Sequence, residues 1–267
     1  VYNGFSADVL KSAGVSSNVV TFGQLLKLEK ANKNNSIKDD LDDLILTSVA
    51  NIVKKSNANV KYDNADLNRP VDIDNLTDAQ KLEISEFYVN GLKQIRNAFK
   101  DSFNVQSETA TTKEAVTLAS KQAEKYEKRG LDPMIHGHVP NAVENVASMR
   151  SDISNMYELK QAVYNNLMFT TYFDGVSNAD KRRPWGHLHA NLNFAKYVGI
   201  DVANINGNHY MITAFSNEGT PASKSNDLAQ LEAKLAEAQK QNSQAQTALE
   251  NAKAELASAS RKYASAL

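Results

Sequence analysis

Apolar residues recur at helical spacing in the middle of the chain. They are spaced by four and three residues, which places them on one face of a long helix. These residues are Ile84, Tyr88, Leu92, Ile95 and Phe99. Thr77 and Gln80, in "TDAQ", form a capping box ahead of them, because each side chain can bond a backbone amide that the helix start leaves unpaired. The pattern predicts a capped helix here.

The same criteria predict two more helices. The first has a capping box at Thr111 and Glu114 and ends near Gly130, which tolerates the left-handed conformation of helix ends. Its buried stripe consists of Val116, Ala119, Ala123 and Tyr126. The second helix begins after Asp152 or Ser154. Its inward-facing residues are Met156, Leu159, Val163 and Leu167.

The periodicity then changes from helix to strand. "YVGIDVAN" and "HYMITAF" are typical of strands, and "INGN" between them predicts a hairpin turn in which Gly207 takes a positive φ. Helices come first and the hairpin last. This order predicts an α+β fold in layers.

The first 75 residues are rich in Asn, Asp, Lys and Ser and contain two predicted helices. These are "FGQLLKLEKAN", capped by Thr21, and "SIKDDLDDLILTSVANIVKK", with the turn "NKNNS" between them. A linker, "YDNADLNRPVDIDN", comes next, with Pro70 as a breaker. We therefore divide the chain into a helical segment over residues 1–75, a globular domain over 76–217 and a tail over 225–267.

The tail is a heptad repeat without a slip. Its a positions are Leu228, Leu235, Asn242, Leu249, Leu256 and Tyr263. Its d positions are Leu231, Ala238, Ala245, Ala252, Ala259 and Ala266. Alanine at d lets two helices approach closely, and Asn242 at an a position fixes register. The predicted helix is roughly 60 Å long and cannot bury its seam alone. Its coiled-coil partner is another segment of the same chain or a second chain, as in a homodimer, and a lone, partly formed helix is the weaker alternative.

Composition excludes several classes of function. The formal net charge of −1 and pI near 6.6 argue against a nucleic-acid or membrane-surface binder, which needs a basic face. No apolar run approaches the roughly 18 residues of a membrane span. The lack of cysteine excludes disulfides, thiolate zinc sites and a Cys nucleophile, and fits an exported Gram-positive protein. Because the chain starts at Val1 and ends within the heptads, we expect it to be a piece of a longer protein.

The five histidines all lie between residues 136 and 209. "IHGHVP" contains His136 and His138, and "WGHLH" contains His187 and His189. Imidazoles that converge with a carboxylate can bind a divalent metal or transfer protons near neutral pH. The structural alternatives are loop histidines that cap backbone groups, a packed corner at the tryptophan and, for His209, a place in a strand.

Three motifs in order resemble the CAP superfamily, which includes the SCP-like, cysteine-rich secretory and pathogenesis-related type 1 domains. "LKQIR" is similar to the first-helix pattern, with Lys93 where Asn is usual. "NAVENVAS" resembles the "GENIA" signature, with Val143 in place of Gly and Glu144–Asn145 preserved. "GHLHANLN", "YVGIDVAN" and "GNHYMITAF" resemble the later signature. With its heptad tail, the chain is most similar to the cell-wall-anchored surface exclusion proteins of the PgrA type.

The resemblance implies an α-β-α sandwich, flanked here by an N-terminal helical segment and a C-terminal coiled-coil helix. It also implies a cleft lined by two His and two Glu. Glu144 matches the first Glu, His136 or His138 the first His, and His187 or His189 the second. These five residues are the candidate catalytic residues.

The second Glu is expected on the third helix. The matching position there falls on Asn165, Asn166 or Leu167, and Glu158 lies about two turns too early. The tetrad is therefore expected to be incomplete.

Two functions are implied by the resemblance. In the first, the extracellular domain binds a surface protein of the same or a neighbouring cell, such as an adhesin, and limits conjugation between cells. In the second, the cleft is a protease site that acts on that adhesin. A Zn²⁺ or Ca²⁺ ion held by His138, Glu144 and His187 would assist it. The missing acid and the absence of a nucleophile favour binding. A lipid- or sterol-binding module is a third possibility, without visible apolar groove residues to support it.

Overall fold

The computed structural model describes residues 2–3, 19–20, 22–32, 38–174 and 185–266. The chain divides into two compact units, Val1–Pro221 and Ala222–Leu267. The expected boundary at residue 75 falls inside the first unit and stays a prediction. No helix among the described residues is both long enough and apolar enough to span a membrane.

A three-stranded antiparallel sheet forms the centre of the first unit. Its strands are β3 (Val143–Met149), β4 (Tyr197–Ile205) and β5 (Asn208–Ser216), in the order β3-β5-β4. The predicted hairpin is confirmed as β4 and β5. Its turn places both Asn206 (φ 55°) and Gly207 (φ 88°) in the left-handed region that tight hairpins require. The edge strand β3 contains the "NAVENVAS" motif, which the hydrophobic pattern alone did not assign to a strand.

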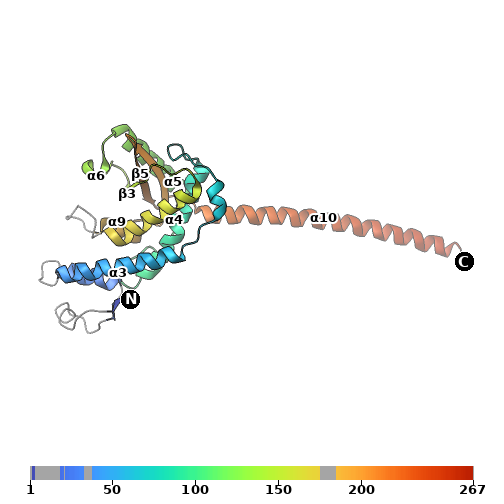
Figure 1. Ribbon diagram of the computed structural model, residues 1–267. Coiled ribbons are helices and arrows are strands. Elements are labelled where there is room, and N and C mark those ends of the chain that lie inside the picture. Colours follow the sequence, from blue (N-terminus) through green and yellow to red (C-terminus); the bar gives the residue numbers. More distant parts are fainter. Residues whose placement is uncertain (1, 4–18, 21, 33–37, 175–184, 267) are drawn as a thin grey trace. The chain divides into compact units, whose positions relative to one another are not determined.

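Helices cover both faces of this sheet (Figure 1). The helix α5 (Lys113–Arg129) lies on one face, where Ala123 and Tyr126 share a small core with alternate residues of the strands, Tyr210 and Ile212 among them. The helix α4 (Asp78–Phe99) lies on the other face and packs against α7 (Met156–Met168). The α+β class and the α-β-α layering expected from the sequence are therefore confirmed.

Gly199 on β4 permits the close approach of α5. A Cβ atom at this position would lie 2.2 Å from the carbonyl carbon of Ala115 and from the amide nitrogen of Val116. No side chain fits in that space. This contact sets how closely the first turn of α5 lies on the sheet.

The helix ends agree with the capping signals, with one correction. Thr77 and Gln80 bond each other's backbone amides as predicted, and Gly130 ends α5 at φ 64°. The second box is wrong by one residue. Thr112, and not Thr111, caps α5 by accepting from the amide of Ala115.

Two π-helical segments continue helices in the first unit. The helix α7 is capped by Asn155, buries its predicted stripe, and runs into the π-segment Phe169–Phe173. The short helix α9 (Gly186–His189) runs into a second π-segment, Ala190–Phe194. A π-turn holds one residue more than an α-turn, so each segment shifts the helical register of the residues after it.

The predicted N-terminal helices are present and join the main core. They are α2 (Phe22–Asn32) and α3 (Lys38–Asn59), and a strand pair, β1 (Tyr2–Asn3) with β2 (Val19–Val20), lies before them. Phe22 contacts the rings of Phe99, Tyr172 and Trp185 edge-on, with centroids 5.3–6.0 Å apart. The predicted cap Thr21 and residues 33–36 of the predicted turn "NKNNS" lie outside the described residues, and its first residue, Asn32, ends α2.

The predicted linker contains a 3₁₀ turn, η1 (Asn64–Asn68), fixed by ion pairs. Asp66, which is 2% exposed, bonds Lys160 of α7 and Arg69, each at 2.7 Å. Glu83 of α4 bonds the same two cations. Hydrogen bonding from Arg69, together with that from Lys160, lowers the pKa of Glu83 to about 2. The network fastens this segment to both helices.

The second unit is one helix, α10 (Ala222–Ala264). Figure 1 shows it as a continuous rod, as the heptads predict. Its large apolar residues beyond residue 230 are all exposed by between 55% and 72%. They are Leu231, Leu235, Leu249, Leu256 and Tyr263.

Candidate functional site

The edge strand β3 presents two neighbouring polar residues to opposite faces of the sheet. Glu144 points toward α5 and contacts Tyr126. Asn145 points toward α9 and donates to the backbone oxygen of His187 and to the side-chain oxygen of Asn191, both at 3.2 Å. The strand β3 therefore contacts one polar cluster on each face of the sheet.

The first half of the site pairs His138 with Glu144. The imidazole Nδ1 lies 3.1 Å from Glu144 Oε1, and the Tyr126 hydroxyl donates to the same oxygen. Gln122 Nε2 donates to the second carboxylate oxygen at 3.2 Å. The Glu144 side chain is 1% exposed and the His138 side chain 54%. A buried, multiply bonded carboxylate therefore holds an exposed imidazole.

The segment directly after His138 is tied to α5. The amide of Val139 donates to the Tyr126 hydroxyl, and Gln122 and Lys125 both donate to the backbone oxygen of Pro140. Burial, and then the hydrogen bond to Glu144, raise the pKa of Tyr126 well above its usual range. Tyr126 thus remains a neutral donor across the physiological range, and Glu144 keeps this hydrogen bond.

The second half of the site pairs His187 with Asp174. The imidazole Nδ1 lies 2.6 Å from Asp174 Oδ1, while the backbone amides of His187 and Leu188 donate to Oδ2 at 2.8 and 3.2 Å. Trp185, the N-cap residue of α9, has φ 68° and makes no side-chain cap. Asp174, 1% exposed, supplies that cap from another helix. Its carboxylate therefore fixes both the start of α9 and the ring on it.

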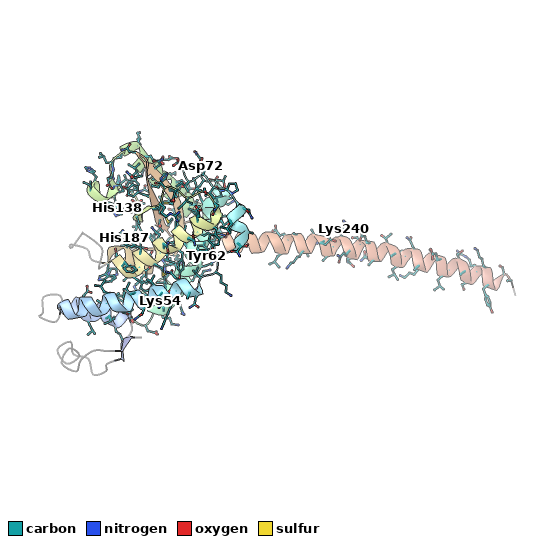
Figure 2. The ribbon with its side chains drawn as sticks, viewed as in Figure 1. Lys54, Tyr62, Asp72, His138, His187 and Lys240 are labelled. Atoms are coloured by element: carbon teal, nitrogen blue, oxygen red, sulfur yellow. The ribbon has the colours of Figure 1, made fainter. Side chains whose placement is uncertain are left out.

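The two pairs share one chemical arrangement. Each imidazole directs Nδ1 to a buried carboxylate, and no described residue bonds its Nε2. When Nδ1–H donates to the carboxylate, the Nε2 lone pair is available to a proton, a donor group or a metal ion. Figure 2 labels His138 and His187, and both lie on the same side of the first unit in this view.

A buried hydrogen-bond network beneath the site joins the two π-segments. Asn191, in the second segment, donates to the hydroxyls of Thr170 and Thr171 in the first, at 3.0 and 3.1 Å. It accepts from Tyr88 at 2.5 Å and from Asn145. Burial raises the pKa of Tyr88 to about 12, so this phenol remains a donor. The network connects α4, β3 and the segments that carry Asp174 and His187.

Arg96, the last residue of "LKQIR", secures the end of the second π-segment. It is 2% exposed and donates to the backbone oxygens of Asn191 and Ala195 at 2.8 and 2.7 Å. It also donates to the Thr109 hydroxyl at 3.0 Å. Burial lowers the pKa of this guanidinium to about 10, because its described partners are neutral. Arg96 therefore acts as scaffold for the helix that carries His187.

The other three histidines lie apart from these carboxylates. His136 is exposed at the end of α6 (Pro133–His136), and His189 is exposed on α9 with its ring against Phe103. His209 is buried on β5, where Nδ1 faces Ser151 Oγ and Nε2 faces Asp74 Oδ1, both at 2.7 Å. His138 and His187 are thus the members of the two doublets that face an acid.

The expectation that the site lacks a second acid is wrong. Asp174 lies directly after the first π-segment, beyond the positions 165–167 at which the resemblance places the second acid. Asn166 and Leu167 are buried, and Glu158 bonds the backbone of Ser154 at the start of α7. The sequence feature that could have identified the second acid is the aspartate in "YFDG", which is Asp174. A regular helix of 3.6 residues per turn does not place residue 174 on the face of the site, because it lacks the register shift of the π-segment.

The structure does not assemble a metal site from these residues. Within the described residues, no three His, Asp or Glu side chains are grouped closely enough to hold an ion. Binding of Zn²⁺ or Ca²⁺ by His138, Glu144 and His187 therefore stays a prediction.

Comparison with known proteins gives one structural similarity. No family model matches the chain, and no curated protein matches it. Among solved structures, the chain is similar to one described as the CAP domain of Enterococcal PrgA, with 16% identity and a TM-score of 0.48. The similarity covers 80% of this chain and 90% of that one.

Proposed function

We propose that the first unit is a CAP-like domain of a cell-surface protein and binds a partner surface protein through His138 and His187. The observation that carries this proposal is the pair of buried carboxylates. Glu144 and Asp174 are each 1% exposed, yet each holds an imidazole that reaches solvent. Burying a carboxylate costs free energy, and histidines that only contact water need no buried acid behind them.

Fixed imidazoles suit recognition for a physical reason. A side chain that is already held in place loses little conformational entropy when a partner binds, so more of the contact energy contributes to affinity. Each ring offers its Nε2 nitrogen to the partner. The site would therefore recognise hydroxyl, amide or acidic groups on the partner protein.

The cellular role is inferred from the sequence motifs and from the heptad tail. The motifs resemble those of CAP domains, and the α-β-α layers agree with that resemblance. In surface exclusion proteins a stalk holds such a domain away from the cell wall, where it limits uptake of a conjugative plasmid. We assign the same role in cell–cell contact to this chain.

The test uses the histidine doublets as their own controls. The full chain is displayed on recipient cells, and the transfer frequency of a conjugative plasmid is measured beside the binding of purified chain to donor cells. His138→Ala with His187→Ala is expected to abolish both effects. His136→Ala with His189→Ala removes the same number of exposed imidazoles and is expected to keep them. The proposal would be refuted if both double variants lost exclusion and binding equally, or if both kept them, at unchanged melting temperature.

A second candidate function is hydrolysis of the partner, and Asp174 favours it. With this residue, each imidazole has the carboxylate that a general base commonly has. His187 Nε2 would take a proton from water, the water oxygen would add to a peptide carbonyl, and the proton would pass to the leaving amine. Incubating adhesin-bearing donor cells with the chain and monitoring the adhesin on gels separates the two functions. Fragments that accumulate with time and vanish with Asp174→Asn indicate turnover, whereas an intact adhesin indicates binding alone.

A further inference from the structure

The apolar seam of α10 is exposed over the part of the helix whose side chains the structure describes, residues 231–266. Leu235, Leu249 and Leu256 at a positions are 60%, 55% and 72% exposed, and Leu231 at d is 61% exposed. The remaining d positions over residues 231–266 are alanine. A second helix that covers such a seam would stabilise α10 by burying these leucines.

Four of the five charges beside this seam over residues 231–266 form a palindrome, and Lys262, at a g position, is the fifth. Glu232 and Lys253 occupy e positions, and Lys234 and Glu255 occupy g positions. Glu232 and Glu255 lie at equal distances from the midpoint between residues 243 and 244, and so do Lys234 and Lys253. A sequence that reads alike in both directions can pair with itself in reverse.

We propose that α10 pairs with α10 of a second copy in antiparallel orientation, centred between residues 243 and 244. In this register Leu235 lies opposite Ala252 of the second copy, and Leu249 opposite its Ala238. In these two layers a large residue faces a small one, whereas Leu231 lies opposite Leu256 of the second copy. The two copies of Asn242 lie in adjacent central layers, where polar a residues specify register.

The charges select this register. In antiparallel pairs e faces e and g faces g, so Glu232 lies beside Lys253 of the second copy and Lys234 beside its Glu255. Symmetry doubles both contacts, which gives four ion pairs. In the single chain Lys253 bonds Glu250 on its own helix at 3.1 Å, with both side chains more than 60% exposed. That bond is weak enough to exchange.

Neighbouring registers and the parallel pair lose these contacts. A shift of one heptad in one direction leaves Glu232 opposite Gln246 and Lys234 opposite Ala248. The opposite shift places Lys234 against Lys262. In a parallel pair each g residue faces the e residue of the next heptad, which sets Lys234 beside Gln239, and no oppositely charged e and g residues meet within residues 231–266.

Charge reversal in halves tests the orientation. Glu232→Lys with Lys234→Glu turns all four ion pairs into like-charge contacts, and so does Lys253→Glu with Glu255→Lys. Each half-variant of the full chain is expected to self-associate at least about tenfold more weakly than the wild type in equilibrium sedimentation. An equimolar mixture of the two restores every pair, so it is expected to regain wild-type affinity.

The control reverses charges off the seam. Glu237→Lys with Lys240→Glu keeps the net charge and lies on the outer face of the helix, so it should leave association unchanged. A mixture of half-variants no tighter than either alone would overturn the antiparallel arrangement. A wild-type chain that stays monomeric up to about 0.1 mM would overturn self-pairing altogether and leave the seam to another segment.

Cross-linking gives an independent readout, since the chain has no cysteine of its own. Leu235→Cys in one copy is expected to form a disulfide with Ala252→Cys in a second, size-tagged copy. Two Leu235→Cys copies should not cross-link, because the proposed register separates them by roughly 25 Å along the axis. A parallel pair predicts the reverse result, with efficient Leu235→Cys self-linking.

Discussion

The two units of the chain use the same residue type in opposite ways. Leu92 and Leu159, on α4 and α7, are 0% exposed, whereas Leu235 and Leu249 on α10 are 60% and 55% exposed. All four recur at helical spacing. The difference is that helices α4 and α7 meet each other and the sheet within one chain, so their burial needs no other molecule. The seam of α10 becomes buried only when another helix covers it. In the proposed pair that helix belongs to a second copy, so the stability of the pair depends on concentration.

The largest test of this contrast compares two leucine truncations. Leu159→Ala is expected to lower the free energy of unfolding of the first unit by about 2–5 kcal/mol, because it leaves a cavity in a closed core. Leu249→Ala should change that unfolding by less than about 0.5 kcal/mol and weaken association of α10 instead. Urea titration monitored by tryptophan fluorescence measures the first effect, since Trp185 lies in this core. If both variants lowered the free energy of unfolding of the first unit by a similar amount, the proposed contrast between the two units would be wrong.

A second test adds volume where the backbone of α5 meets the sheet. Gly199→Ala is expected to cost about 1–3 kcal/mol, because a Cβ at 2.2 Å from the backbone of Ala115 forces helix and strand apart. Gly186→Ala is the matched control. A Cβ there meets nothing within 4 Å, so its effect should stay within about 0.5 kcal/mol. Thermal unfolding of both variants measures these losses of stability. A Gly199→Ala variant as stable as the wild type would contradict the close approach of α5 to β4.

A third test concerns the ion network that fixes the predicted linker. The pKa of Glu83 falls from its ordinary value near 4.5 to about 2 on folding. Its contribution to stability is therefore complete above about pH 4.5 and is lost as the pH falls toward 2. Allowing for partial exposure, we expect roughly 1–2 kcal/mol. The free energy of unfolding of Glu83→Gln should depend on pH less steeply than that of the wild type over this window. Parallel pH profiles would refute the assignment.

The smallest expected effect belongs to an ion pair on α10. Glu250 and Lys253 are 3.1 Å apart, but their side chains are 72% and 62% exposed. Glu250→Ala is expected to change helicity by circular dichroism only slightly, equivalent to less than about 0.5 kcal/mol. A loss as large as that of Glu83→Gln would mean that exposure does not set the strength of these two pairs.

Local signals were sufficient for much of the fold. The capping box at Thr77, the stop at Gly130 and the turn at Gly207 were all predictable, because each depends on residues within one turn of the chain. The second box failed by one residue because adjacent threonines both satisfy the pattern, and only Thr112 has its hydroxyl at the amide of Ala115. Strands β4 and β5 were predictable because their short apolar segments are typical of strands and flank a turn.

Contacts between distant segments were less predictable. Glu144, His138 and His187 were candidates from motifs. Tyr126 and Gln122 reach Glu144 from helix α5, and the sequence placed Tyr126 only in the core and gave Gln122 no role. The linker could not show that Asp66 would bond Lys160, which lies 94 residues further along. Asp174 was missed because the helix before it departs from a regular period.

The π-segment Phe169–Phe173 makes the site depend on chain length as well as on residue type. Removing one residue from it would restore an ordinary helical turn and rotate every later residue of the helix by roughly 100° about the axis. The Asp174 carboxylate would then point away from His187 and from the start of α9, although both residues would still be present. A single-residue deletion in this segment would therefore break the contact between Asp174 and His187 without changing either residue.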